Sequence, residues 1–186
     1  MADGVRERLV AAGVELVVRE GAGTLTLREI ARRAGVSHGA PRRYFPTHRD
    51  LLAAIAWEGY RSLGRRIAAI DDTADPRARV LALGRLYLDF AAAERGMFEL
   101  MFRHDLLRGN GIGLREASLG LFGVLVDLVR EARPDAPEPA VVAGALWANL
   151  HGIAQLRQWG SLEVPAGTDD PEPFLRAAVD AHLGRC

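Results

Sequence analysis

The stretch "TLREIARRAGVSHGAPRRYF", residues 26–45, decides the fold of this chain, and it contains five arginines. Thr26 stands where a helix cap is favoured, and Glu29 follows three residues later, as in a capping box. Gly35 can adopt the positive φ that a tight turn needs. The stretch therefore predicts two short helices separated by a glycine turn, which is the helix-turn-helix pattern.

The two helices are too short to be stable alone. The first is expected over residues 27–34, and the second from Ser37 or His38 to about Phe45. Helices of this length depend on tertiary packing. A longer helix expected over residues 3–20, which ends before a glycine, supplies an apolar face for them to pack on.

The remainder of the chain also has helical periodicity, without a convincing period of two. We therefore expect an all-α fold of about nine helices, with a three-helix helix-turn-helix head joined by helix 4 to a helical-bundle body. The expected helices lie near residues 3–20, 27–34, 37–45, 47–70, 76–94, 95–103, 113–132, 138–159 and 171–184. The predicted boundaries divide the chain into a head over 1–46, a connecting helix within 47–75, and a larger helical body over 76–186.

Composition narrows the class of protein. The 186 residues are 49% hydrophobic and 26% charged, which is typical of a folded chain. No apolar run approaches the roughly 18–20 residues that span a bilayer, and the charged start lacks the apolar centre of a signal peptide. We expect a cytoplasmic protein. The single cysteine, Cys186, excludes an internal disulfide and the usual cysteine-rich zinc site, and we expect no metal and no cofactor.

Charge is distributed unevenly, although the formal net charge is zero. Residues 1–70 contain 12 Arg against 7 Asp and Glu, whereas residues 71–186 contain 12 Arg against 17 acids. Such asymmetry indicates that one end of the chain binds a polyanion.

The second helix of the motif is the candidate recognition helix. The side chains that it is expected to present outward are Ser37, His38, Gly39, Ala40, Arg42, Arg43 and Tyr44. In a helix-turn-helix the second helix enters the major groove, while the first crosses the backbone. Arginines there contact phosphates and read guanine. For Arg32 and Arg33 on the first helix, a merely solvated face is an alternative interpretation.

The segment "LTLREIARRAGVSHGAPRRYFPTHRDLLAAI", residues 25–55, resembles the DNA-binding head of TetR-type bacterial transcriptional regulators. The family pattern approximates T-x-x-x-I-A-x-x-A-G-V-S-x-G-x-x-Y-x-H-F-x-x-K-x-x-L, and the resemblance covers about residues 5–55. It implies phosphate contacts from Thr26 and from the start of the third helix. The base contacts that it implies come from Arg28, His38, Ala40 and Arg43.

Four positions depart from the family pattern. Arg42 replaces the usual tyrosine, Tyr44 the histidine, and His48 the lysine at the start of the fourth helix. All three side chains can still donate to phosphate, so DNA binding is expected to persist. Pro41 replaces a common leucine, which the first turn of a helix tolerates. The resemblance to the family does not indicate which operator sequence this chain reads.

The segment "ALWANLHGIAQLRQWG", residues 145–160, resembles a Trp-x-x-x-His-Gly segment in the carboxy-terminal domain of one branch of this family. Gly144, Ala148 and Gly152 form a ridge of small residues that permits close helix packing. In this family the last two long helices, here 138–159 and 171–184, usually pair with a second subunit. The resemblance thus implies a DNA-binding domain over 1–46, a ligand-binding and dimerisation domain over 76–186, and a homodimer on a palindromic operator of double-stranded DNA.

Methionine and aromatic side chains of the body suit an adaptable apolar pocket for a small-molecule effector. The predicted ligand-binding residues are Phe90, Met97, Met101, Phe102, Phe122, Trp147 and His151, with Tyr87, Phe98 and Leu125 as further candidates. Plain core packing is the alternative for each of them, including His151.

The leading hypothesis is a sequence-specific, homodimeric transcriptional repressor that a small apolar or amphipathic ligand releases from DNA. One alternative is a DNA-binding regulator without an inducer, controlled by a protein partner or by its own abundance. A remote alternative is an all-α enzyme or carrier. The sequence argues against an enzyme, because it has no nucleophile with a plausible base, carboxylate pair, metal-ligand spacing or glycine-rich phosphate loop.

Overall fold

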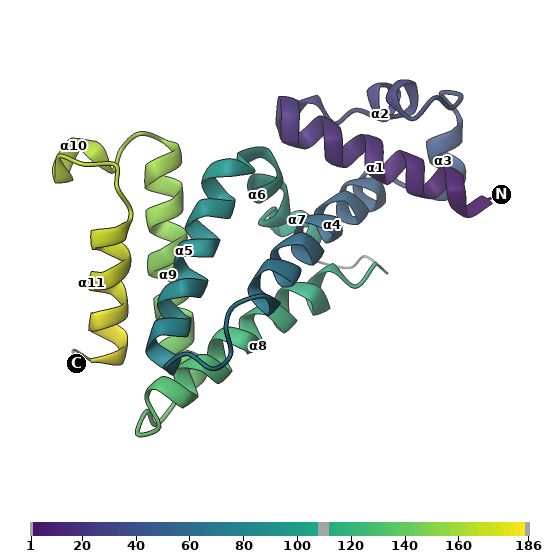
Figure 1. Ribbon diagram of the computed structural model, residues 1–186. Coiled ribbons are helices and arrows are strands. Elements are labelled where there is room, and N and C mark those ends of the chain that lie inside the picture. The colour runs from purple at the N-terminus through teal and green to yellow at the C-terminus, as the bar shows by residue number, and fades with distance from the viewer. Residues whose placement is uncertain (1, 108–111, 185–186) are drawn as a thin grey trace. The chain divides into compact units, whose positions relative to one another are not determined.

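The computed structural model describes residues 2–107 and 112–184, and in this part of the chain it contains helices and no strand (Figure 1). The predicted all-α class is confirmed. The helices are α1 (Ala2–Glu20), α2 (Leu27–Arg33), α3 (Ala40–Tyr44), α4 (His48–Ala68), α5 (Pro76–Ala93), α6 (Arg95–Met101), α7 (His104–Leu107), α8 (Leu114–Ala132), α9 (Pro139–Gln158), α10 (Glu163–Ala166) and α11 (Glu172–Leu183), with a 3-10 turn, η1 (Ala22–Thr24), after α1. Cys186 lies outside the described residues.

Three short elements were not expected from the sequence: η1, α7 and α10. Each has three or four residues, which is too few to show a helical period. The recognition helix α3 begins at Ala40, later than predicted. The Ala40 amide donates to the carbonyl of Ser37 at 2.9 Å, so the residues before α3 form a turn.

The packing divides the chain into two compact units. Unit 1 comprises Met1–Ser62 and Glu94–Ser118, and unit 2 comprises Leu63–Ala93 and Leu119–Cys186. Both α4 and α8 contribute residues to the two units. Unit 1 therefore combines the amino-terminal helices with α6 and α7, which lie far along the sequence.

In unit 1, α1 packs against α2, α3, η1 and α6. Leu9, Leu16 and Ile30 are fully buried. Gly13 allows α4 to approach α1 closely, since a β-carbon at Gly13 would lie 2.2 Å from Cδ1 of Ile55. Burial of each such aliphatic side chain contributes about 1.5–3 kcal/mol, which stabilises the short α2 and α3.

In unit 2, α5, α9 and α11 lie side by side (Figure 1). Gly84 of α5 admits Leu175 of α11, because a β-carbon at Gly84 would lie 2.5 Å from Cδ1 of that leucine. At the edge of the same pair of helices, Arg85 forms two hydrogen bonds with Glu172, at 2.8 and 2.6 Å. These contacts hold the carboxy-terminal helix to the body.

None of the described helices combines the length and the apolar character that crossing a membrane requires.

Candidate nucleic-acid interface

The turn between α2 and α3 has the geometry that the sequence predicts. Gly35 adopts a φ of 64°, in the left-handed region that favours glycine. The Val36 amide donates to the carbonyl of Ala31 at 3.1 Å and closes the end of α2. Gly35 thus reverses the chain directly after α2 and leads it into α3.

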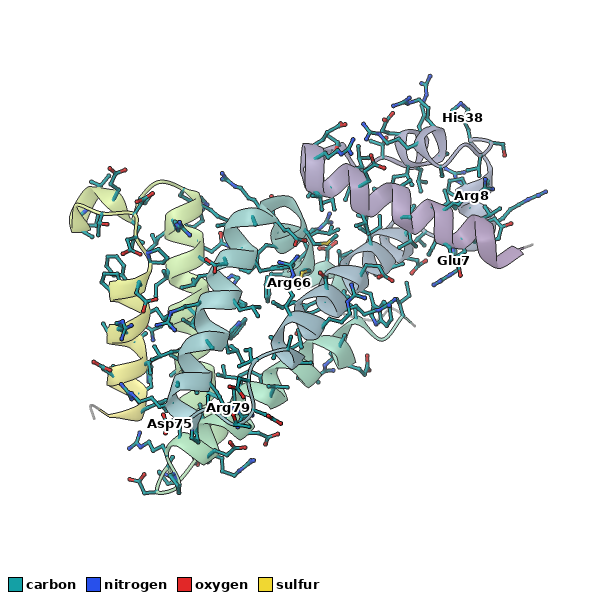
Figure 2. All side chains as sticks on the ribbon, in the orientation of Figure 1. Glu7, Arg8, His38, Arg66, Asp75 and Arg79 are labelled. Atoms are coloured by element: carbon teal, nitrogen blue, oxygen red, sulfur yellow. The ribbon has the colours of Figure 1, made fainter. Side chains whose placement is uncertain are left out.

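Helix α3 has a buried side and a free side. Pro41 and Phe45 are buried in unit 1, which anchors α3 against the rest of the unit. On the other side Arg42 and Arg43 are exposed, and Figure 2 shows the exposed His38 on the turn that precedes the helix. Of the other predicted DNA-contact residues on this segment, Ser37 and Gly39 are exposed, and Ala40 and Tyr44 are half-buried.

The arginines of α2 and α3 differ in their ion pairs. Arg32 binds Glu29 at 2.5 Å, and Arg33 binds both Glu29, at 3.1 Å, and Glu20. The hydrogen bond from Arg32, followed by that from Arg33, lowers the pKa of the Glu29 carboxyl to about 2. By contrast, Arg42 and Arg43 form no ion pair with any described residue. Of these four arginines, the two on the recognition helix are therefore the ones without an internal counter-ion.

Arg28, near the start of α2, is likewise exposed and has no ion pair within residues 2–107 and 112–184. Its neighbour Thr26 is exposed and caps α2, because its hydroxyl accepts a hydrogen bond from the Glu29 amide at 3.2 Å. Only half of the expected capping box is present, since the Glu29 carboxylate turns to the two arginines instead of to the Thr26 amide. The Thr26 hydroxyl retains its own proton for donation to a phosphate.

The start of α4 carries the reciprocal capping box. The Thr47 amide donates to the Asp50 carboxylate at 2.9 Å, and the Asp50 amide donates to the Thr47 hydroxyl at 3.1 Å. The sequence predicted Thr47 as the cap. His48, the first residue of α4, is exposed, but its Nε2 lies 2.6 Å from the Leu25 carbonyl. The sequence did not indicate this contact, because the two residues are 23 positions apart.

Three of the predicted ligand residues belong to unit 1. Met97 and Met101 are buried and pack on Gly59 of α4, where a β-carbon would lie 2.6 Å from the Met101 sulfur. Phe102 contacts the rings of Phe98 and Tyr60, with centroids 4.8 and 6.2 Å away. These side chains fill the space between α4 and α6 in the unit that carries the DNA-contact candidates.

The other four predicted ligand residues, Phe90, Phe122, Trp147 and His151, belong to unit 2. The Trp147 and His151 rings lie 5.7 Å apart on one side of α9. Burial lowers the pKa of His151. Phe90 is fully buried beneath the Arg66 guanidinium, 5.2 Å from its ring centroid. The seven residues thus form two groups in different units, and their part in ligand binding stays a prediction.

Unit 2 also contains a pocket of about 300 Å³ between α5, α9 and α11. It is lined by charged and apolar residues, namely Arg85, Leu88, Asp89, Arg157, Asp170, Pro171, Glu172 and Leu175. None of the predicted ligand residues lines it. Its lining comes from α5, α9, α11 and the two residues before α11, so no single segment of sequence indicated it.

Helix α9 has an outward side without a charged residue. The side chains at one-turn and two-turn spacing along this side are Val141, Ala145, Ala148, Gly152, Leu156 and Trp159. Val141, Leu156 and Trp159 are among the exposed large apolar residues of the described chain. On α11, Pro173, Ala177 and Ala181 are exposed at four-residue spacing. Two adjacent helices therefore present small and apolar surfaces to solvent.

Comparison with protein families gives two matches. The family described as "Bacterial regulatory proteins, tetR family" matches residues 9–55. The family described as "Tetracyclin repressor-like, C-terminal domain" matches residues 80–182, which is more than half of the chain.

Individual proteins agree with these matches. A protein with unknown function from Rhodococcus sp. RHA1 is 30% identical, with a TM-score of 0.76 over 96% of this chain and 93% of that one. The multidrug binding protein EbrR, in complex with ethidium, has the same fold at 22% identity, with a TM-score of 0.70 over 96% of this chain and 98% of that one. The nucleoid occlusion factor SlmA of Marinobacter nauticus is 28% identical over 128 residues, 68% of this chain and 65% of the relative. The chain spans less than two thirds of the length of the curated relatives that it matches.

Proposed function

The chain belongs to the TetR family of DNA-binding transcriptional regulators, and we propose that it is a cytoplasmic, homodimeric repressor that a small apolar or amphipathic molecule releases from its operator. Three features of the structure support this proposal: the cations of α3, the outward side of α9, and the buried aromatic and methionine groups.

The free arginines of α3 carry the proposal. Arg42 and Arg43 are exposed and have no counter-ion within the described residues, whereas Arg32 and Arg33 of the adjacent helix are neutralised by Glu29 and Glu20. A cation without an internal partner is available to a phosphate oxygen or to the O6 and N7 atoms of guanine. The proposed DNA-contact residues remain Thr26, Arg28, Ser37, His38, Gly39, Ala40, Arg42, Arg43, Tyr44 and His48.

The apolar side of α9 supports a homodimer. Close packing between helices needs small residues at the crossing, and Ala148 and Gly152 provide them at the centre of this side. Pairing of α9 and α11 with the same helices of a second copy would bury the apolar surface in an isologous interface. A twofold dimer then presents two α3 helices to half-sites about 34 Å apart.

A small-molecule effector is supported by the fold that this chain shares with EbrR, which binds ethidium in a solved structure. In this chain, Met97 and Met101 supply polarizable, adaptable packing next to α4 of the DNA-binding unit. A ligand that shifts such packing would weaken DNA binding, and DNA would weaken ligand binding by the same factor, typically about 5- to 150-fold.

Selection of binding sites from random duplex DNA tests this function. We expect a palindrome whose half-sites lie about one helical turn apart, bound more weakly as salt rises. Adding decanoate, an amphipathic probe of the apolar site that does not intercalate into DNA, to the complex with the selected palindrome then tests release. If the selection enriches no sequence, the claim that the protein recognises a specific operator is contradicted. If the affinity for DNA is undiminished with the ligand bound, the release mechanism is contradicted.

A further inference from the structure

Gly96, the second residue of α6, touches the backbone of the amino-terminal helices. A β-carbon at this position would lie 2.4 Å from the Val17 carbonyl oxygen and 2.8 Å from Cα of Gly21. Both neighbours are backbone atoms, so they cannot turn aside as a side-chain end would. Only glycine permits α6 to lie this close to the end of α1.

The Val17 carbonyl has a structural role of its own. It accepts the hydrogen bond of the Gly21 amide at 3.0 Å, which closes the last turn of α1. Gly21 has a φ of 84°, and its carbonyl in turn accepts the Thr24 hydroxyl at 2.8 Å. The contact with Gly96 therefore bears directly on the geometry of the link between α1 and α2.

This link comprises residues 21–26. Its last two residues fix the side chains of two proposed phosphate contacts, His48 and Thr26. The Leu25 carbonyl holds the ring of His48 through the 2.6 Å contact with Nε2. The next residue, Thr26, caps α2. The position of both side chains thus depends on a short, hydrogen-bonded segment whose other side rests on α6.

We propose that Gly96 is a positioning residue for DNA binding: by seating α6 against residues 17–22, it sets the link that holds Thr26 and His48 in place for the phosphate backbone. This inference rests on the phosphate contacts proposed above. According to this inference, α6 affects the DNA-binding surface through its contact with the link between α1 and α2. Helix α6 follows α5 directly along the chain.

The test is the salt dependence of operator binding by Gly96→Ala, measured by fluorescence anisotropy. The slope of log K against log salt is about −0.9 for each phosphate contacted. We expect Gly96→Ala to bind the operator at least about tenfold more weakly. We also expect a shallower slope, which corresponds to the loss of up to two phosphate contacts per subunit. A merely destabilised protein would bind less in proportion to its unfolded fraction but would keep the slope.

Gly84→Ala is the matched control, because a β-carbon there lies 2.5 Å from Leu175 in unit 2 and so crowds a core without touching the link. It is expected to keep the slope of the wild type. If Gly96→Ala keeps both affinity and slope, or loses affinity with an unchanged slope, the proposal is overturned.

Thr24→Val provides a second test in case Gly96→Ala does not fold. It removes the hydrogen bond to the Gly21 carbonyl and keeps the branched side chain, and we expect a smaller slope and weaker binding. Thr73→Val, which removes the hydrogen bond to Asp71 in unit 2, is its control. An unchanged slope for Thr24→Val overturns the proposal. Absence of sequence-specific binding by the wild type would instead overturn the proposed function.

Discussion

The hydroxyl of Tyr87 lies 2.9 Å from Nδ1 of His151, which joins α5 to α9 through a half-buried hydrogen bond. With the neutral ring protonated on Nε2, the tyrosine donates and Nδ1 accepts, and protonation of Nδ1 would remove that acceptor. Burial also disfavours the charged ring and lowers the pKa of His151 below its usual 6.5.

The stability of the protein should therefore depend on pH through His151. As the pH falls below about 6.5, the unfolded chain takes up a proton before the folded chain does, so the free energy of unfolding decreases. We expect the melting temperature to fall between pH 7 and pH 5, and to fall less in His151→Gln. His38→Gln is the control, because His38 is exposed. If the melting temperature of His151→Gln falls as much as that of the wild type, His151 is not the group that makes stability depend on pH.

Gly152 tests the proposed dimer. Nothing lies within 4 Å of a β-carbon built on this residue, so Gly152→Arg leaves the subunit core undisturbed. Removing glycine from a helix interior should not reduce helix stability. We expect Gly152→Arg to be a folded monomer in analytical ultracentrifugation. Gly120→Arg, at an equally open position on α8, should stay a dimer. A dimeric Gly152→Arg would exclude this face as the interface.

Tyr60→Phe tests how the packing of α6 on α4 is stabilised. The Tyr60 hydroxyl is buried and donates to the Met101 carbonyl at 2.9 Å. Losing this bond should reduce the free energy of unfolding by about 1 kcal/mol, measured by urea denaturation. Tyr44→Phe removes a hydroxyl from the half-buried Tyr44 of α3 and should leave stability unchanged. Equal effects of the two substitutions would count against a specific role for this bond.

Glu29→Gln should strengthen DNA binding. The pKa of about 2 keeps Glu29 ionised at neutral pH, where it neutralises Arg32 and Arg33. Removing the charge frees Arg32 and leaves Arg33 paired with Glu20 alone, on the helix that crosses the DNA backbone. We expect tighter binding and a steeper dependence on salt. Glu58→Gln, which frees Arg61 on α4, is the control. Weaker binding by Glu29→Gln would mean that the ion pairs orient α2 for DNA.

Local patterns predicted much of this structure. The cap at Thr26, the left-handed turn at Gly35 and the cap at Thr47 follow from residue types a few positions apart, because such contacts form within one turn. The helical class follows from the periodicity of the apolar residues in the same way.

Contacts between distant residues escaped prediction. Gly96 and Val17 are separated by most of the amino-terminal half, and nothing in either segment indicates that their backbones touch. The bond between His48 and Leu25 has no local pattern for the same reason. The membership of α6 in unit 1 depends on such contacts, so the sequence placed Met97 and Met101 with the body instead of with the DNA-binding helices.

The most direct test of the account is the affinity of Arg42→Ala/Arg43→Ala for the selected operator. The matched control is Arg19→Ala/Arg61→Ala, which removes two arginines of the same unit that pair with Glu15 and Glu58. Since each good bidentate contact with a base contributes about 1–3 kcal/mol and a dimer contains each arginine twice, we predict at least a roughly 100-fold loss for the first protein and a loss of a few-fold at most for the second. Wild-type affinity in a folded Arg42→Ala/Arg43→Ala protein would contradict the claim that α3 reads DNA.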